Sequence, residues 1–303
     1  MSSNRKIVAV TGASGFIGRY VCAAFADVGY GVLRLGRGPD SDRQTDYTYA
    51  SLKEALVGVY GVVHLAGRRM IRADAPMDLA PFWLPNVAVI GNLAAAAQDS
   101  GVQRLILAST IAAYSPSSGT PYVETAPPRP VNAYALSKVM AEAHLEMLTR
   151  TVGPKALALR LAAVYGQGEK GTPALMHFVA EASAGRDLVM TGSPDACIDQ
   201  LYVRDAAQAF VAAMISDAVG VLNVGGGRAW RIAEIAAEVN GIFGCGGIVR
   251  DASQDRGAMP QAVMDITAAR AAIGWRPVFD LRLGLEDFRQ TRDIEARQRS
   301  ISD

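Results

Sequence analysis

The chain has 303 residues, half of them hydrophobic, and can bury a large core in one large domain or two interleaved ones. Its 30 basic and 29 acidic residues give a formal net charge of +1 and form no stripe. This balance excludes a long-range attraction to nucleic acid or to an anionic membrane. Three histidines and three cysteines without CxxC spacing argue against a metal site. We expect Cys22, Cys197 and Cys245 to be small apolar filler in a reducing compartment.

The N-terminus carries no sign of a secretory signal, because the polar residues 1–5 run directly into a strand-like segment. The longest uncharged stretch, Leu79 to Gln98, contains two prolines and two asparagines. A membrane span would not carry these residues readily, so we interpret the stretch as a buried helix. We expect a cytoplasmic protein.

Strand-like and helix-like segments alternate along the first half of the chain. Apolar runs predict strands at 6–10, 31–35, 59–65, 104–108 and 156–161, and helical spacing predicts helices at 16–28, 88–98 and 132–151. This alternation predicts an α/β fold with a doubly wound parallel sheet covered on both faces. In such sheets ligands bind beyond the carboxyl ends of the strands, so chemistry is expected just after each strand.

The pattern changes after Gly166, where glycine and proline become frequent and the elements shorten. Helices are still predicted at 203–215 and 231–242, and the charged tail 285–303 reads as a solvated terminal helix. We therefore expect a dinucleotide-binding domain over 1–165 and a smaller, partly interleaved substrate lobe over 166–303. Some segments, at about 199–224, are expected to return to the first domain.

A glycine-rich turn, TGASGFIG, joins the first predicted strand to the first helix. Gly12 allows the tight turn, Gly15 lets the backbone approach a pyrophosphate, and Gly18 allows close packing of helix on strand. The start of the helix offers free N–H groups and a positive dipole end to phosphates. A three-glycine pattern in this strand–turn–helix context predicts dinucleotide binding.

The end of the second strand bears on the choice of cofactor. An NAD site usually has an acidic residue there, but this chain has Gly36 followed by Arg37. An arginine can hold the 2′-phosphate of NADP, which a carboxylate would repel. The sequence therefore favours NADP. In the alternative, NAD is bound, Arg37 is a surface residue, and Asp40 or Asp42 folds back to the ribose.

A tyrosine and a lysine stand four residues apart at Tyr134 and Lys138, on one face of the predicted helix. An ammonium beside a phenol lowers the phenol pKa, so that the tyrosine can exchange a proton with a substrate oxygen. Ser109 and Thr110 end a neighbouring strand and place hydroxyls at the same sheet edge. His64 is expected to pack within its strand rather than to catalyse.

With these residues, the chain resembles an extended short-chain dehydrogenase/reductase, and more narrowly the NAD(P)-dependent sugar-nucleotide epimerase/dehydratase family. The resemblance covers nearly the whole chain. It rests on TGASGFIG at Thr11, HLAG at His64, LASTIAAY at Leu107, YALSK at Tyr134, LRLAAVYG at Leu159, LYVRDAAQAF at Leu201 and IGWRP at Ile273. It implies a Rossmann sheet.

The resemblance also implies roles for single residues. Tyr134 would be the acid/base, Lys138 its partner, and Thr110 the hydroxyl residue of the catalytic triad. Asp46 and Tyr47 match the pair that contacts adenine. The other cofactor contacts implied are Phe16, Ile17, Leu65, Ala66, Gly67, Asn86 and Ala162, beside Tyr134 and Lys138.

Four departures from the family pattern bear on the substrate. Ile111 and Ala112 replace the two acids that follow the threonine in 4,6-dehydratases, which disfavours water elimination. Ala163 stands near an asparagine of galactose epimerases that touches the nucleotide sugar. Asp199 and Gln200 stand where those enzymes often have an arginine, and the segment after Asn86 lacks the usual Gly-Thr.

The leading hypothesis is hydride transfer on a nucleotide sugar, by an epimerase that retains NAD or by a 4-ketoreductase that uses and releases NADPH. A reductase of non-sugar carbonyls and a non-catalytic NAD(P)-binding sensor are the alternatives. The only partner that we expect is a small-molecule substrate, and a homodimer is left open.

Overall fold

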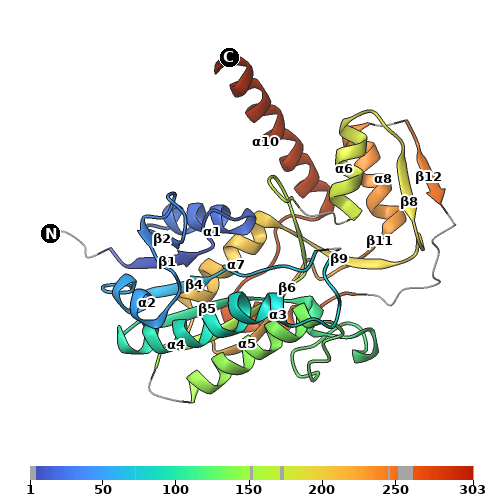
Figure 1. Ribbon diagram of the computed structural model, residues 1–303. Coiled ribbons are helices and arrows are strands. Elements are labelled where there is room, and N and C mark those ends of the chain that lie inside the picture. The colour runs from blue at the N-terminus through green and yellow to red at the C-terminus, as the bar shows by residue number, and fades with distance from the viewer. Residues whose placement is uncertain are drawn as a thin grey trace.

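A seven-stranded, entirely parallel sheet forms the centre of the computed structural model, which describes residues 5–71, 73–150, 153–170, 174–244, 246–251 and 262–302 (Figure 1). The strand order is β10-β6-β5-β4-β1-β2-β3. These strands span Ile7–Thr11 (β1), Gly31–Gly36 (β2), Arg43–Gln44 (β3), Gly61–His64 (β4), Arg104–Thr110 (β5), Lys155–Leu161 (β6) and Gly220–Val224 (β10). The predicted doubly wound α/β fold is confirmed.

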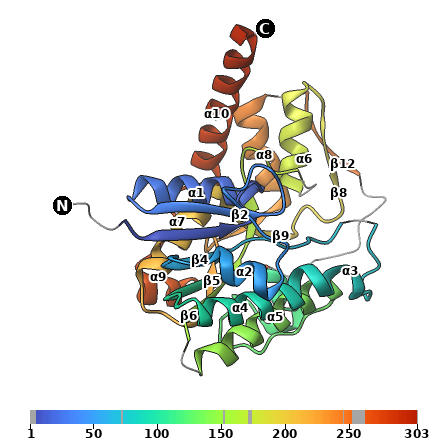
Figure 2. The same cartoon turned by 60° about the vertical axis from the view of Figure 1, so that its left-hand side comes forward.

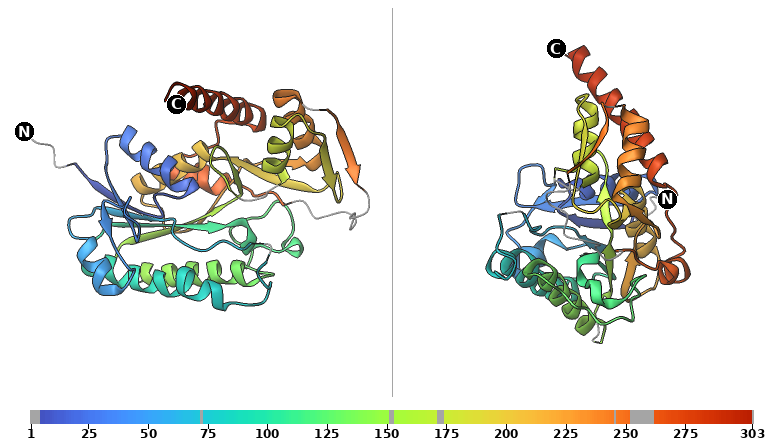
Figure 3. Two further views of the ribbon diagram at one scale, coloured as in Figure 1. Left: turned by 45° about the horizontal axis from the view of Figure 1, so that its top comes forward. Right: turned by 90° about the vertical axis from the view of Figure 1, so that its right-hand side faces the viewer.

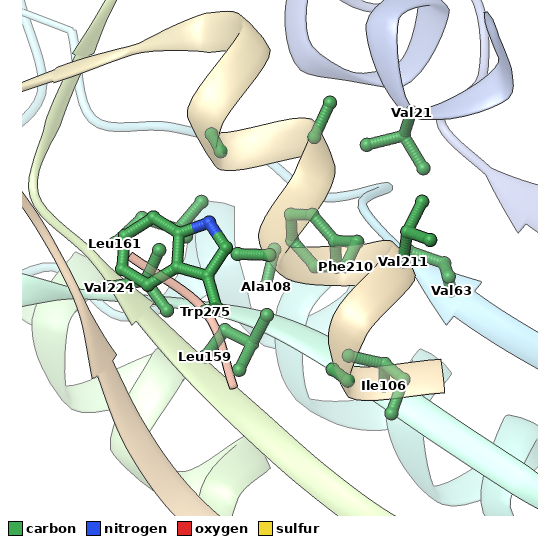
Figure 4. Close-up of a cluster of buried hydrophobic side chains, with 14 of the residues drawn as sticks. Val21, Val63, Ile106, Ala108, Leu159, Leu161, Phe210, Val211, Val224 and Trp275 are labelled. Carbon is green, nitrogen blue, oxygen red and sulfur yellow. The ribbon is translucent and has the colours of Figure 1, made fainter. Parts of the chain in front are cut away.

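Helices cover both faces of this sheet (Figures 1 and 2). One face carries α1 (Phe16–Asp27) and α7 (Val203–Ile215), and the other carries α2 (Tyr49–Ala55), α4 (Val89–Asp99) and α5 (Ala133–Thr149). Figure 4 shows the core beneath α7, where Phe210 and Val211 lie among strand residues such as Val63 and Ile106. Burial on both faces explains why these strands read as continuous apolar runs.

The predicted helix at 88–98 begins earlier in the structure. A short helix, α3 (Ala80–Phe82), and a π-helical turn, Trp83–Ala88, lead into α4. Pro85 lies in this turn and has no N–H to donate, which accounts for a locally shifted hydrogen-bond ladder. The stretch Ala80–Asp99 is long and apolar enough to cross a membrane by length and composition alone, yet half of its most apolar window is buried in the protein.

A second lobe contains two small sheets, with strand orders β11-β9-β7 and β12-β8 (Figures 1 and 3). Helices α6 and α8 pack together there, and α10 projects away from the rest of the molecule (Figure 3). The bounds are Ala163–Tyr165 (β7), Ala174–Ser183 (α6), Leu188–Thr191 (β8), Cys197–Tyr202 (β9), Ala229–Arg231 (β11), Ile232–Phe243 (α8), Ile248–Asp251 (β12) and Leu281–Ser302 (α10). A further helix, α9 (Thr267–Ile273), packs in the core of the large sheet instead.

The chain crosses between the lobes more than once. After β9, helix α7 packs against α1, and β10 then pairs with β6 in the large sheet. Asp205 in α7 accepts hydrogen bonds from the N–H groups of Val278 and Phe279, which fixes the segment leading to α10. Of the three cysteines, Cys22 and Cys197 are free thiols, and Cys245 lies outside the described residues.

Candidate active site

The glycine loop lies at the switch point of the sheet, where β1 has β2 on one side and β4 on the other. Gly12 has a φ of +68°, and a Cβ there would lie 2.7 Å from the Ala66 nitrogen at the end of β4. A Cβ on Gly18 would lie 2.1 Å from the Gly12 carbonyl oxygen. The loop is therefore packed too closely for side chains at both positions, as the sequence predicts.

The N-terminus of α1 is open to an anion. Gly15 caps the helix without a side-chain hydrogen bond, and the first turn has no acidic residue. A cavity of about 550 Å³ begins here, and a second of about 330 Å³ extends toward the end of β2. The two cavities share Gly12, Ser14 and Gly67 in their walls, so they form one cleft along the sheet edge. Its length and its glycine walls suit an extended dinucleotide.

The cavity at the end of β2 contains Arg37, whose guanidinium carbon lies 5.3 Å from the centre of the Tyr47 ring. Asp42 faces away, because its carboxylate accepts hydrogen bonds from the Arg34 side chain and backbone. These bonds hold the pKa of Asp42 below its usual value. Asp40 also lines the cavity.

Asp46 does not line this cavity. Its carboxylate accepts hydrogen bonds from the N–H and hydroxyl of Thr48 at the start of α2, and it lies in a separate shallow pocket with Arg37. Tyr47 alone of the predicted adenine pair lines the cleft, with a positive φ of 67°.

Tyr134 lies in the first turn of α5, a helix that begins where the Asn132 side chain accepts a hydrogen bond from the Ala135 N–H. Thr110 ends the neighbouring strand β5, and its hydroxyl lies near enough to the Tyr134 phenol to act on the phenol pKa. Two of the predicted catalytic residues therefore lie near each other at the carboxyl edge of the sheet. Such a pair of hydroxyls can hold one substrate oxygen between them.

The charges around Tyr134 differ from those expected from the sequence. Burial raises the pKa of Tyr134, while the Thr110 hydroxyl and the charge of Arg69 act in the opposite direction. The Lys138 ammonium donates to the Ala108 carbonyl oxygen at 3.0 Å. Burial lowers the pKa of Lys138 to about 8, and the nearby Glu142 opposes this change. The charge of Arg69 thus acts on the phenol, in addition to the lysine expected from the sequence.

Asn86, in the π-helical turn, fixes the loop that follows β4. Its Oδ1 accepts from the Arg68 N–H at 2.8 Å, and its Nδ2 donates to the Arg68 carbonyl and to the Ser137 hydroxyl. A Cβ on Gly67 would lie 2.9 Å from Asn86 Oδ1 and 3.5 Å from Lys138 Nζ. Backbone without a side chain therefore lies beside the lysine at Gly67. Asn86 holds this loop in place through its bonds to the Arg68 backbone.

Ser109 does not face the cleft, contrary to expectation. Successive strand residues point to opposite faces, and its hydroxyl donates to Glu142, which is buried and paired with Arg160 at 2.7 Å. The Arg160 guanidinium in turn stacks on the Tyr114 ring. This network lies behind the site and does not line the cleft.

Two further residues are structural in their contacts. His64 is buried, and its Nδ1 is hydrogen-bonded to the Thr11 hydroxyl at 2.8 Å. Burial lowers the pKa of His64 to about 3, which keeps the ring neutral. Ala162 is also buried and donates its N–H to the Val224 carbonyl, which ties β6 to β10. Its predicted cofactor contact stays a prediction.

The family model of the NAD dependent epimerase/dehydratase family matches residues 8–225. The chain belongs to this family. It is thus an enzyme of the extended short-chain dehydrogenase/reductase type, as its motifs indicate.

Similar proteins include other members of the family. UDP-glucose 4-epimerase of Azospirillum brasilense is 28% identical, over 90% of this chain and 88% of that protein. dTDP-4-dehydro-6-deoxyglucose reductase of Escherichia coli is 22% identical, over 91% of this chain and 95% of that protein. The crystal structure of UDP-N-acetylglucosamine 4-epimerase from Bacillus cereus superimposes with a TM-score of 0.85 and 28% identity, covering 93% of this chain and 95% of that chain.

Sequence reasoning missed Arg69 and Glu169, which line the cleft and form an ion pair with each other. A signal for Arg69 was present, because it lies just beyond the carboxyl end of a predicted strand. Glu169 had no comparable signal. It lies far away in the sequence, and only the tertiary fold brings it to the glycine loop.

Proposed function

We propose that this chain transfers hydride at C4 of a nucleotide sugar, as an NAD(P)-dependent 4-epimerase or 4-ketoreductase with Tyr134 as acid/base. The observation that carries the proposal is the placement of Tyr134 and Lys138 one turn apart on α5, with the buried Lys138 ammonium beside the bare wall of Gly67 at the sheet edge. The names of the relatives, which include both 4-epimerases and a reductase, support the same chemistry.

The residues of the cleft fit a nicotinamide dinucleotide. Gly12 and Gly67 leave space that a Cβ would fill, and the start of α1 presents unpaired N–H groups. The glycine loop would hold the pyrophosphate, and Lys138 and Gly67 would lie along the nicotinamide ribose. When bound, the cofactor supplies the acceptor or donor of hydride.

The chain's own residues would handle the proton. Tyr134 is protonated at neutral pH, because burial raises its pKa, and so it can donate to a ketone oxygen. Thr110 would orient that oxygen, and the positive charges of Arg69 and Lys138 would stabilise the phenolate that remains. In the oxidative direction the same phenolate would take the proton of a sugar hydroxyl.

NADP is the cofactor that we propose, with NAD as the alternative. The Arg37 guanidinium lines the cavity at the end of β2, and Gly36 adds no side chain there. Asp42 is engaged with Arg34, which removes one of the two carboxylates that the NAD alternative requires. Asp40 is the remaining candidate for a ribose contact.

A 4,6-dehydratase activity is not proposed. Ile111 and Ala112 follow Thr110 directly in a single 3-10 turn, so the two positions carry no group that could act as acid or base. We expect no 4-keto-6-deoxy product from UDP-glucose or dTDP-glucose.

Two assays test the proposed function. The first measures interconversion of UDP-glucose and UDP-galactose without added cofactor, and the second measures NADPH oxidation with a nucleotide 4-ketosugar. Mass spectrometry of the purified protein identifies any cofactor that remains bound. Retained NAD together with interconversion of the two UDP-sugars indicates the epimerase. NADPH oxidation without that interconversion indicates the reductase. If the Tyr134→Phe variant keeps both activities, the proposed mechanism is wrong.

We also propose a homodimer formed through the exposed side of α5. Leu136 and Met147 are both exposed on this helix, and their spacing of eleven residues places them on one side of it. Light scattering tests it, because Leu136→Glu with Met147→Glu should convert a dimer to a monomer.

A further inference from the structure

A buried phenylalanine packs against the ring of the proposed acid/base. Phe82 ends α3, which lies beside α5 (Figures 1 and 2), and its side chain is fully buried. The centres of the Phe82 and Tyr134 rings are 6.0 Å apart, and the ring planes meet at 60° in an edge-to-face contact. Aromatic pairs prefer such a geometry, so the contact favours one orientation of the Tyr134 ring.

Phe82 is itself held in place. The Arg68 guanidinium carbon lies 5.5 Å from the centre of the Phe82 ring. The Arg68 side chain forms an ion pair with Asp74, and the Arg68 backbone is fixed by two hydrogen bonds to the Asn86 side chain. Phe82 thus contacts a fixed cation as well as the Tyr134 ring, and close packing leaves it little room to move.

The backbone at Tyr134 is tied to the same segment that follows β4. The preceding residue, Ala133, donates its N–H to the Pro76 carbonyl oxygen at 2.7 Å, and Asn132 caps the helix. With this backbone fixed, the place of the phenol oxygen depends on the torsion about the Cα–Cβ bond, which has three staggered wells. A ring packed against Tyr134 restricts that choice.

We propose that Phe82 is a positioning residue, which keeps the Tyr134 phenol directed at the reacting oxygen of the substrate. The inference rests on the proposed role of Tyr134 as acid/base. Phe82 lines neither of the two cavities that form the cleft, so it acts on the reaction through Tyr134 and not by binding a ligand. A small misplacement of a reacting group is enough to slow proton transfer.

Replacing the Phe82 ring should change turnover and leave binding almost unaffected. In Phe82→Leu, kcat should fall about tenfold, whereas KM for the nucleotide sugar and cofactor affinity should change by less than about twofold. Phe25→Leu is the matched control. Phe25 is also fully buried and contacts Tyr30 edge-to-face, with ring centres 5.6 Å apart, and it does not line the cleft. The control should lose stability and keep the wild-type kcat.

The same substitution in a Tyr134→Phe background separates positioning from a general structural role. Tyr134→Phe keeps the ring that Phe82 contacts and removes the proton donor. If Phe82 acts through the phenol, adding Phe82→Leu should leave the residual kcat unchanged. An equal fold loss in both backgrounds, or a wild-type kcat in Phe82→Leu alone, overturns the inference while the proposed function stands. A wild-type kcat in Tyr134→Phe alone overturns both.

Phe82→Met keeps the test open if leucine at this buried position prevents folding. Methionine adapts its shape to irregular space in a core, so this variant should fold. It lacks a rigid ring, so the same loss of kcat is expected in the background that carries Tyr134, and none in Tyr134→Phe. A wild-type kcat in Phe82→Met overturns the inference.

Discussion

The large sheet and the second lobe are assembled in different ways. In the sheet, β1, β3, β4 and β5 are each followed by a covering helix, and backbone and glycine at the strand ends form the walls of the cleft. In the second lobe, short strands pair across long stretches of sequence, as when β8 pairs with β12 and β9 with β7 and β11. The backbone walls at the sheet edge change little when side chains change, whereas the surface of the second lobe is set by its side chains. We infer that the sheet determines the chemistry and the lobe determines the substrate.

The largest expected effect tests the support beneath the site. Glu142→Leu alone would leave the buried Arg160 charge unpaired, and Arg160→Met alone would leave the buried Glu142 charge unpaired. Each single variant should lower the free energy of unfolding by about 3–5 kcal/mol. The double variant Glu142→Leu with Arg160→Met should recover most of this loss. Denaturant titration measures all three. Additive losses in the double variant would contradict a coupled pair.

The acid/base assignment predicts the next effect. Tyr134→Phe keeps the ring but removes the proton donor, so turnover should fall by about two orders of magnitude or more, with little change in cofactor affinity. Tyr49→Phe, on α2 at the surface, is the control. If the chemistry resides in the sheet, the loss should be equal for every nucleotide sugar that the enzyme accepts. Near wild-type turnover would disprove the assignment.

Lys138 predicts the pH dependence. Its folded pKa is lowered to about 8, so the ammonium is present at pH 7 and is lost as pH rises through about 8. A profile of kcat/KM should therefore fall above about pH 8, approaching tenfold per pH unit where one proton is lost. Lys138→Arg stays charged and should lose this alkaline limb. An unchanged limb in that variant would assign it to another group.

Cofactor preference should respond to Arg37. Arg37→Gln removes a charge-assisted contact to a 2′-phosphate, so NADP affinity should fall about tenfold while NAD affinity changes little. An acidic replacement at Gly36 would require the Ser41 side chain to rotate, because a Cβ at Gly36 would lie 2.8 Å from the Ser41 hydroxyl. Calorimetric titration of both cofactors decides the point. Tighter binding of NAD than NADP by the wild type would favour the retained-NAD epimerase.

The smallest effect belongs to the second lobe. Asp199 is buried behind Gly226 and Met264, and burial raises its pKa from 3.8 to about 7. The unfolded chain releases this proton at lower pH, so Asp199 should cost stability as pH rises from about 4 to 7. Relative to Asp199→Asn, wild type should lose at least about 1 kcal/mol over that range. If the stability of wild type and of Asp199→Asn changes equally over that pH range, Asp199 is ionised in the folded protein.

The sheet half could be predicted from local patterns, because each strand there is a continuous apolar run followed by a turn signal. The glycine loop and Thr110 follow such runs directly, and Tyr134 and Lys138 lie at the start of the helix that follows β5. Two kinds of feature could not be predicted in this way. Glu169 reaches the cleft from another part of the chain, and β8 pairs with β12, which lies far along the sequence.

One signal in the sequence was present and overlooked. Arg160 interrupts the otherwise apolar strand Lys155–Leu161, and a buried strand does not carry a charge without a partner. Glu142, one helical turn beyond Lys138, is that partner. The pair explains why Ser109 turns away from the cleft while its neighbour Thr110 faces it.

The return of the chain from β9 through α7 to β10 bears on how the protein can be dissected. A fragment that ends near residue 165 would leave β6 as an open edge and strip α1 of the helix packed beside it. Such a fragment should associate through that edge instead of binding cofactor. Exchange of substrate lobes between relatives would therefore require two junctions that keep α7 and β10 with the sheet.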